Sequence, residues 1–245
     1  HGLAAVGATW ALSYIICYFC IGTCIGISVP LSQSYGAGKQ HKLRCYYSNG
    51  IFFSIGLAVV ITSITTLLCR QFLVWLQTPA DVLNDAYVYL VIIFAGLPFT
   101  ILYNFCFGVL MALGDSSKSS VFMGISTVLN LFLDLFTIVV LHWGVAGAAL
   151  ATIFSQGMAG LCSLIYIIKK YDILRPHPGE WKIRAPYIRN IIRMSMPMGL
   201  QYSITAIGAI ILQYSVNTLG STAIAGFSAG SKIKSFFVCP LNSLG

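Results

Sequence analysis

One apolar run carries a carboxylate near its middle: Ser126-Thr-Val-Leu-Asn130-Leu-Phe-Leu-Asp134-Leu-Phe-Thr-Ile-Val-Val-Leu141. Asp134 is the only formal charge between Lys118 and Lys169. A carboxylate is expensive in hydrocarbon, so such residues mark functional sites by default. Asn130 stands four residues earlier on the same helical face, from which its amide can reach the carboxylate. We therefore take this pair as the candidate functional centre of a membrane protein.

The whole chain shares the apolar character of this run. Its 245 residues are 58% apolar and only 8% charged, and its mean hydropathy is +0.85. A soluble domain of this length needs far more charged surface, so the composition indicates a polytopic membrane protein. The chain begins at His1 without a methionine and ends at Gly245 inside an apolar run. We expect the parent protein to be longer.

Uncharged runs of about twenty apolar residues predict membrane-spanning helices. Helices are favoured over barrel strands because each run is continuously apolar rather than alternating. A seventh run begins near Ser221 and continues to Gly245. Pro98 lies centrally in its run, which makes it a candidate hinge and a candidate cavity-lining residue. The six complete runs, which predict an all-α protein, are 3–31, 45–69, 86–112, 119–141, 145–168 and 190–219.

Basic residues are distributed unequally over the predicted loops. The first, third and fifth loops hold eleven Lys and Arg, whereas the second and fourth hold one. The positive-inside rule then predicts that the odd loops are cytoplasmic and that His1 is extracellular or periplasmic, in an inner or plasma cell membrane. This bias accounts for most of the net charge of +8, so we expect no nucleic-acid partner. Residues 169–186 are polar and carry prolines, and we expect them to form a cytoplasmic linker.

The linker separates two predicted groups of helices. Residues 1–168 form the first lobe, which lacks its first helix, and residues 187–245 begin a second lobe. A weak repeat at an offset of 219 supports two lobes, because six spans separate its copies and both copies then cross the membrane in the same direction. The copies, 3–26 and 222–245, match at Ala4/Ala223, Gly7/Gly226, Cys20/Cys239 and Gly26/Gly245.

Depth in the membrane predicts that a third polar residue, Thr152, lies beside Asn130 and Asp134. The fourth span ends near Leu141 and the fifth begins near Val145. Asp134 lies seven residues before the first of these points and Thr152 seven after the second, so each is ~10 Å from the outer end. We therefore expect Asn130, Asp134 and Thr152 to form one polar cluster that couples transport to a proton or a cation.

Two further residues are candidates for lining a cavity. Gln156 lies one turn beyond Thr152, and Lys232 falls near the midplane of the last span. Lys232 and Lys234 are 200° apart on a helix, so they cannot both face one cavity. A structural alternative remains open for Asp134, in which a neighbouring lysine or a simple interhelical hydrogen bond neutralises it.

Other motifs predict packing rather than chemistry. Gly226-Phe-Ser228-Ala-Gly230 fits G-x-S-x-G, but that motif requires a strand–turn–helix elbow. An intramembrane serine protease that uses Ser228 is therefore a remote alternative, and no catalytic residue is assigned. Gly22-x-x-x-Gly26 and Gly226-x-x-x-Gly230 are typical of helix packing. Three cysteines that share a helical face lack further metal ligands, so we interpret them as small buried hydrophobes: Cys17, Cys20 and Cys24.

Several segments resemble the multidrug and toxic compound extrusion (MATE) transporters, in order along the whole chain. The resemblance implies helices two to eight of a twelve-helix antiporter with two six-helix lobes, related by a parallel pseudo-repeat. The segments are Ser32–Gly38 with the basic loop after it, Met111–Asp115, Asn130-x3-Asp134, Gly144-Val-Ala-Gly-Ala-Ala-Leu-Ala-Thr152-x3-Gln156 and Gly220–Ala225.

Site residues follow from this resemblance position by position. In the branch similar to DinF proteins, an Asn and an Asp on helix five and a Thr on helix six form the coupling site of the first lobe, and they match Asn130, Asp134 and Thr152. That site also uses an aspartate on helix one. The NorM branch carries a glutamate in helix seven, but residues 195–219 contain no acid. The resemblance therefore favours coupling in the first lobe.

The function implied is export of small organic, cationic or amphipathic compounds such as drugs, in exchange for H⁺ or Na⁺. The expected partners are a small-molecule substrate and the lipid bilayer, and we expect a monomer. We expect no cofactor and no metal, apart from the coupling ion, which would bind as Na⁺ at Asp134. An alternative function within the same superfamily is a lipid-linked saccharide flippase, which a more cationic cavity would indicate.

Overall fold

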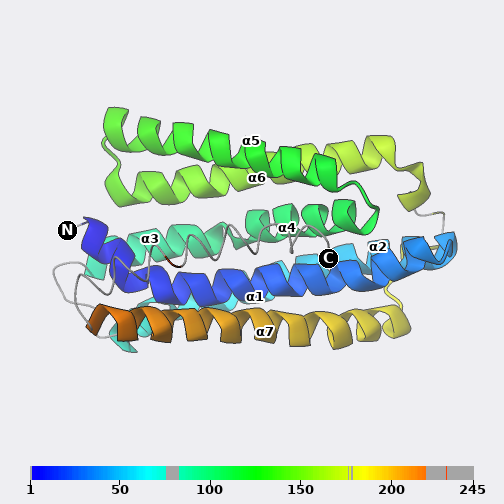
Figure 1. Ribbon diagram of the computed structural model, residues 1–245, viewed down its shortest axis with the longest axis horizontal. Helices are drawn as coiled ribbons and strands as arrows, with labels where there is room; N and C mark the ends of the chain where they lie inside the picture. Colours follow the sequence, from blue (N-terminus) through cyan, green and yellow to red (C-terminus); the bar gives the residue numbers. More distant parts are fainter. Residues whose placement is uncertain (1, 76–82, 176, 178, 219–229, 231–245) are drawn as a thin grey trace. The chain divides into compact units, whose positions relative to one another are not determined.

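The computed structural model describes residues 2–75, 83–175, 177, 179–218 and 230, and these residues are helical apart from short connections. The chain divides into a unit that ends at Ser203 and a unit that begins at Ile204. The helices, drawn in Figure 1, are α1 (Gly2–Gly36), α2 (Gln40–Trp75), α3 (Leu83–Ala95), α4 (Leu97–Ala112), α5 (Ser116–Leu135), the π-helical turn η1 (Phe136–Val140), α6 (Gly144–Lys170), the 3₁₀ turn η2 (Asp172–Leu174) and α7 (Ala185–Thr218).

Six predicted spans are confirmed as helices within this description. Five segments are each long and apolar enough to cross a membrane, and the bent pair α3–α4 qualifies together as a sixth, judged by length and composition. The seventh predicted span, with Lys232, Lys234 and Ser228, lies outside the described residues apart from Gly230. The all-α, multi-pass class is therefore confirmed.

The third span, expected over 86–112 with Pro98 as its hinge candidate, is broken close to that proline. α3 and α4 meet at Gly96 with a bend of 43°. Pro98 lies in the first turn of α4, where its missing N–H leaves no helical bond unmade. A Cβ atom at position 96 would lie 2.3 Å from the Ile153 side chain of α6. Glycine is therefore required at the bend, because α6 packs directly on it.

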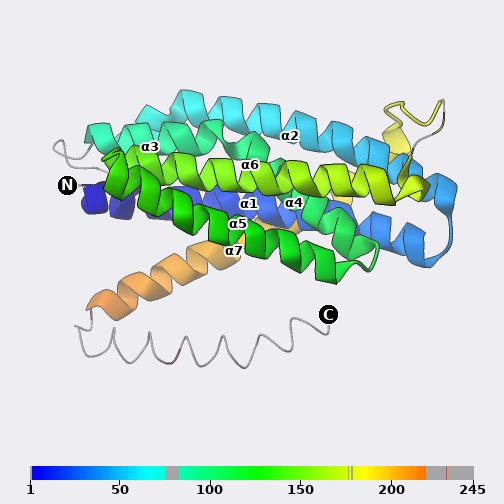
Figure 2. The ribbon, with the colours of Figure 1, turned by 90° about the horizontal axis from the view of Figure 1, so that it is seen from above.

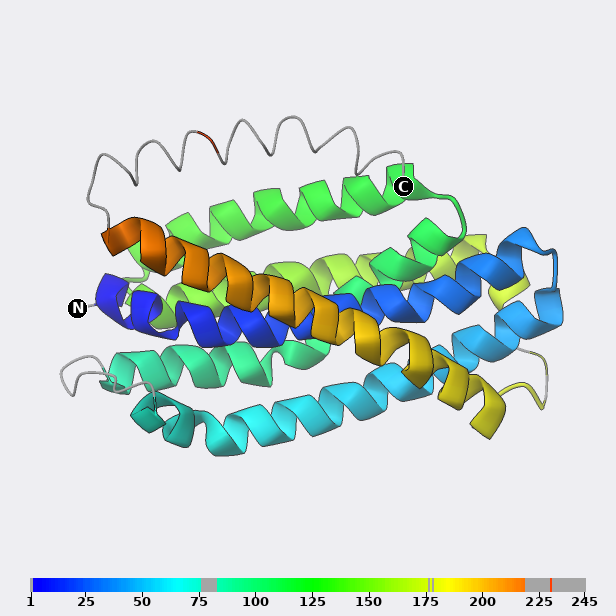
Figure 3. The ribbon, with the colours of Figure 1, turned by 60° about the horizontal axis from the view of Figure 1, so that its bottom comes forward.

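Small residues bring the other helices close together. A Cβ at Gly26 of α1 would lie 2.3 Å from the Cα of Ser195 in the first half of α7, and one at Gly22 would lie 2.7 Å from the Met198 carbonyl oxygen. Figure 3 shows this half of α7 beside α1. The packing role of Gly22-x-x-x-Gly26 is confirmed. Cys20 and Cys24 lie in the apolar core with at most 1% of their surface exposed, as expected for buried hydrophobes.

The connections α1–α2, α4–α5 and α6–α7 lie at one end of the first unit (Figure 2). Asp115 holds two of them together, because it caps α5 by accepting from the backbone N–H of Lys118 and its Oδ2 accepts from side chains at the end of α6. The donors are Tyr171 Oη at 2.6 Å, Lys170 Nζ at 2.9 Å and Tyr166 Oη at 3.0 Å. These bonds, led by that from Tyr171, hold the pKa of Asp115 well below its usual value.

Candidate functional site

The antiparallel hairpin of α5 and α6 brings two of the predicted site residues together. Asn130 Nδ2 donates to Thr152 Oγ1 over 3.4 Å, and Thr152 Oγ1 donates to the Ala148 carbonyl at 3.0 Å. The sequence had placed the Asn130 amide against Asp134, but the structure gives this amide a partner on the other helix. The depth argument for Asn130 and Thr152 therefore gave the correct neighbours.

Asp134 lies one turn beyond this contact and is half-buried. Its Oδ1 atom is fully buried, and no group among the described residues donates a hydrogen bond to it. The π-helical turn begins two residues later, and Thr137 Oγ1 donates to the backbone carbonyl of Leu133 at 2.8 Å instead of to the carboxylate. An unpartnered carboxylate oxygen inside a span is unfavourable unless it binds a proton or a cation. Asp134 is thus available as an acceptor.

Tyr89 of α3 is a neighbour that sequence reasoning missed. Tyr89 lies within electrostatic range of Asp134 and of Cys17 of α1. Tyr89 lies six residues after the start of α3 at Leu83, ~9 Å along the helix, but only three residues after the start predicted at 86. The depth argument applied to the predicted span would have placed Tyr89 ~5 Å from the outer end, above the level of Asp134.

A small cavity of about 210 Å³ opens beside the Asn130–Thr152 contact. Gln156 also lines it, as predicted, and its Oε1 accepts a 2.6 Å hydrogen bond from Thr100 Oγ1 of α4. Asp134 does not line this cavity. The polar residues of the α5–α6 hairpin therefore form two adjacent sites, the cavity beside Asn130 and Thr152 and the carboxylate of Asp134. The lining consists of Tyr103, Met123, Ser126, Thr127, Asn130, Thr152, Ser155 and Gln156. Pro98 lines a different and larger cavity.

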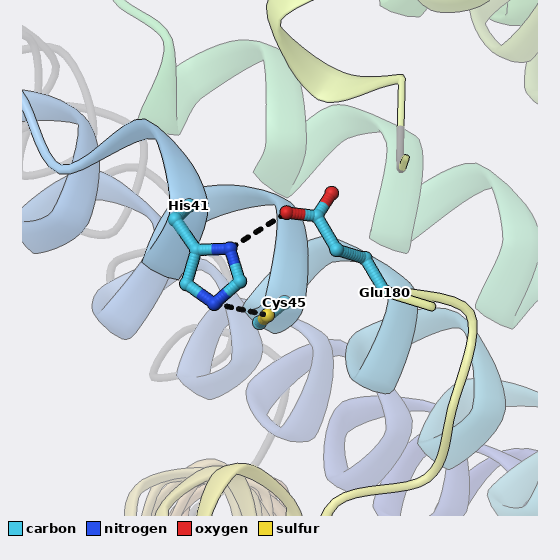
Figure 4. Close-up of side chains that lie close together, drawn as sticks. All are labelled: His41, Cys45 and Glu180. Atoms are coloured by element: carbon cyan, nitrogen blue, oxygen red, sulfur yellow. Dashed lines mark hydrogen bonds and ion pairs between the residues drawn. The ribbon is translucent and has the colours of Figure 1, made fainter. Parts of the chain in front are cut away.

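Three residues of the kinds that bind metal ions lie together at the end where the α1–α2 and α6–α7 connections meet: His41, Cys45 and Glu180 (Figure 4). His41 Nδ1 is 2.7 Å from Glu180 Oε1, and its Nε2 is 3.7 Å from Cys45 Sγ. The two imidazole nitrogens face opposite ways, so one ion cannot replace both contacts. Arg44 Nε donates to Glu180 Oε2 at 2.8 Å, which already neutralises this carboxylate. We interpret the cluster as an ion-pair clasp.

The clasp joins the segment after α6 to α2. Hydrogen bonds from Arg44, followed by those from the His177 backbone N–H and His41, lower the pKa of Glu180 to about 2. Ser48 Oγ donates to the Glu180 carbonyl at 3.0 Å, and Asn49 Oδ1 accepts from the Arg184 backbone N–H at 2.9 Å. No sequence pattern signalled these long-range pairs.

Comparison with known proteins identifies the family. A family model described as MatE matches residues 1–136, so the chain belongs to the MATE family of transporters, as the resemblance implied. It is 32% identical over 246 residues to the probable multidrug resistance protein YpnP of Bacillus subtilis (strain 168), across 100% of this chain and 54% of that protein. It is 27% identical over 236 residues to the multidrug export protein MepA of Staphylococcus haemolyticus (strain JCSC1435), across 96% and 52%.

The fold agrees with solved structures of the same family. A structure described as the inward-facing conformation of a multidrug resistance MATE family transporter of the MOP superfamily superposes with a TM-score of 0.82 at 23% identity, over 98% of this chain and 55% of that chain. The chain thus spans about half the length of the relatives it matches, as part of a two-lobe, twelve-helix fold.

Family membership sets aside the enzyme alternative, because MATE proteins are transporters. The lobe boundaries, the side of the membrane on which each loop lies, the monomeric state and the roles of the site residues stay predictions.

Proposed function

We propose that this chain is part of a secondary antiporter that exports small organic compounds, cationic or amphipathic in character, in exchange for H⁺ or Na⁺. The names of the relatives support multidrug efflux. The unpartnered Oδ1 of Asp134 inside a membrane span is the observation that carries ion coupling. The transporter lies in the cell membrane as a monomer, with His1 outside and the 169–186 linker in the cytoplasm.

Asp134 is the proton or cation acceptor in this mechanism. Protonation turns the carboxylate into a neutral group that can donate a hydrogen bond, and Na⁺ binding satisfies its lone pairs directly. The Asn130 amide donates from its nitrogen to Thr152, which leaves the amide oxygen as a further ligand for a hard cation. Either ion removes the penalty of the buried charge.

In this mechanism the charge state of Asp134 changes the angle of the bend at Gly96. Tyr89 of α3 lies within electrostatic range of Asp134, and α3 ends at the bend. Neutralising the carboxylate changes its interaction with Tyr89 and therefore biases the angle between α3 and α4. A ligand shifts a conformational equilibrium only by its difference in affinity for the two states, and each tenfold difference corresponds to ~1.4 kcal/mol. Pro98, directly after the bend, is the hinge in this scheme.

Efflux from cells that express the full-length protein tests the proposal. We expect Asp134→Asn to insert at wild-type level but to lose dye efflux driven by a gradient, because asparagine cannot take up a proton or supply the charge for Na⁺. Asp172→Asn removes an exposed carboxylate outside the spans and is the matched control. Ionophores that collapse the H⁺ and Na⁺ gradients separately identify the ion. Undiminished efflux by Asp134→Asn would contradict the coupling role.

A further inference from the structure

A large apolar groove lies apart from the polar residues of the α5–α6 hairpin. Its volume is about 1010 Å³, at the upper end of the ~300–1,000 Å³ typical of ligand pockets. α4 packs against both α2 and α6, whereas over the described residues α2 and α6 do not contact each other. α4 therefore forms the floor of the groove, and α2 and α6 form its walls.

The groove is open along a rim of exposed apolar side chains. Its rim includes Val59 of α2, which is 60% exposed, and Ile168 of α6, which is 51% exposed. Both residues lie within membrane spans. The part of a molecule that is buried in the groove is therefore apolar, as a lipid of the bilayer provides.

The length of the groove matches one leaflet. At one end Trp181 lines it and packs edge-on against Phe52 of α2, with ring centroids 6.0 Å apart. Along α2 the lining runs from Tyr47 to Ser63, sixteen residues and so ~24 Å. Along α4 it reaches Pro98, next to the bend toward α3. A single leaflet with its headgroup region is about half of ~40–45 Å, so one phospholipid with its headgroup occupies most of this length.

The end formed by the 171–181 segment is suited to an anionic headgroup. Arg175 lines the groove there, and the indole of Trp181 is of the kind found at headgroup level. Arg175 Nε contacts Asp172 Oδ1 at 3.0 Å, but both side chains are mostly exposed, and such pairs contribute only ~0–1 kcal/mol. The guanidinium can therefore exchange this carboxylate for a phosphate, which it binds in a bidentate manner.

A buried hydroxyl near this end lacks a partner. Ser54 lines the groove two residues beyond Phe52 and is 7% exposed, and its Oγ has no hydrogen-bond partner among the described groups. This position is ~3 Å below the level of Trp181, where the ester carbonyls of a phospholipid follow its phosphate. Rotation about one side-chain bond turns the hydroxyl toward such an acceptor.

We propose that this groove binds one anionic phospholipid from the leaflet beside the 171–181 segment, with its phosphate on Arg175 and its acyl chains between α2 and α6. The bound lipid fills the space between two helices that do not contact each other over the described residues. The site does not depend on the proposed coupling role of Asp134, which lies on α5, outside the lining of the groove.

Native mass spectrometry of the full-length protein tests this site. The protein is stripped of lipid in detergent and titrated with palmitoyl-oleoyl phosphatidylglycerol or with the zwitterionic phosphatidylcholine of the same chains. Wild type should bind one phosphatidylglycerol more tightly than phosphatidylcholine, by about fivefold for one favourable basic contact. Arg175→Gln should abolish this preference, whereas Lys169→Gln, an exposed change outside the groove lining, should retain it.

A second pair of variants tests the location. Val59→Trp places an indole at the rim and should weaken binding of both lipids by about tenfold, since it occupies the space of an acyl chain. Val60→Trp is the control, because Val60 is 54% exposed on the same helix but does not line the groove. Equal lipid binding by Val59→Trp and Val60→Trp would overturn the proposal. So would equal affinity of wild type for the two lipids, or retention of a lipophilic cation in place of phosphatidylglycerol.

Discussion

Glu180→Gln should open the clasp between the segment after α6 and α2. The Glu180 side chain is 7% exposed and pairs with Arg44 and His41. Its pKa is lowered from 4.5 to about 2 by these bonds, led by those from Arg44. Glutamine keeps the shape but loses the charge, so we expect a loss of about 2 kcal/mol in the stability of the clasp. Cys45 is fully buried beneath His41 and reports the opening.

The assay is pulsed maleimide labelling of the full-length protein, with the Cys45 peptide quantified by mass spectrometry. At neutral pH the variant should label about 30-fold faster than wild type, which corresponds to ~2 kcal/mol. Because the pKa is depressed in the folded state, the stabilisation is complete above pH 4.5 and is lost as the pH falls toward about 2. Asp172→Asn, which breaks an exposed ion pair, is the control and should label like wild type. Equal labelling of Glu180→Gln and wild type would refute the clasp.

Two further substitutions test the packing and the loop contacts. Gly96→Ala places a Cβ 2.3 Å from Ile153 and should lower stability by about 1–3 kcal/mol, measured as a lower Tm. The control Gly124→Ala has no neighbour within 4 Å and should leave the Tm unchanged or slightly raised. Equal Tm values for the two variants would show that the bend tolerates a side chain. Asp115→Asn removes the carboxylate that binds Lys170 and should lower the Tm by an amount equivalent to about 1.5–3 kcal/mol at neutral pH. The difference from wild type should shrink as the pH falls below the usual pKa of aspartate. A difference that is independent of pH would contradict a stabilising role for the charge of Asp115.

The spans were predictable because a bilayer demands continuous apolar helices. The same regularity made depth predictable, which is why Asn130 and Thr152 were correctly placed side by side from residue counts alone. The position of the break at Gly96 was not predicted, although Pro98, two residues later, was the hinge candidate of this span. It depends on the close approach of Ile153, a contact between distant parts of the chain that no local pattern records.

Side-chain pairing was less accessible than helix placement. Counting along α5 gave Asn130 and Asp134 a common face, but it could not show that the amide would bond across to α6 and leave Asp134 Oδ1 without a donor. Tyr89 was missed because the third span was predicted to begin at 86, three residues after α3 begins at Leu83. The Glu180 clasp joins residues more than 130 positions apart, and polar loops carry no periodicity from which such pairs can be derived.

The most direct test of ion coupling at Asp134 is counterflow in proteoliposomes that contain the full-length protein. Addition of a transported cationic dye should drive H⁺ or Na⁺ across the membrane, recorded with an internal pH or Na⁺ indicator. We predict that wild type shows dye-dependent ion counterflow and that Asp134→Asn still binds the dye but moves no ion. Ion counterflow at the wild-type rate by Asp134→Asn would contradict the account.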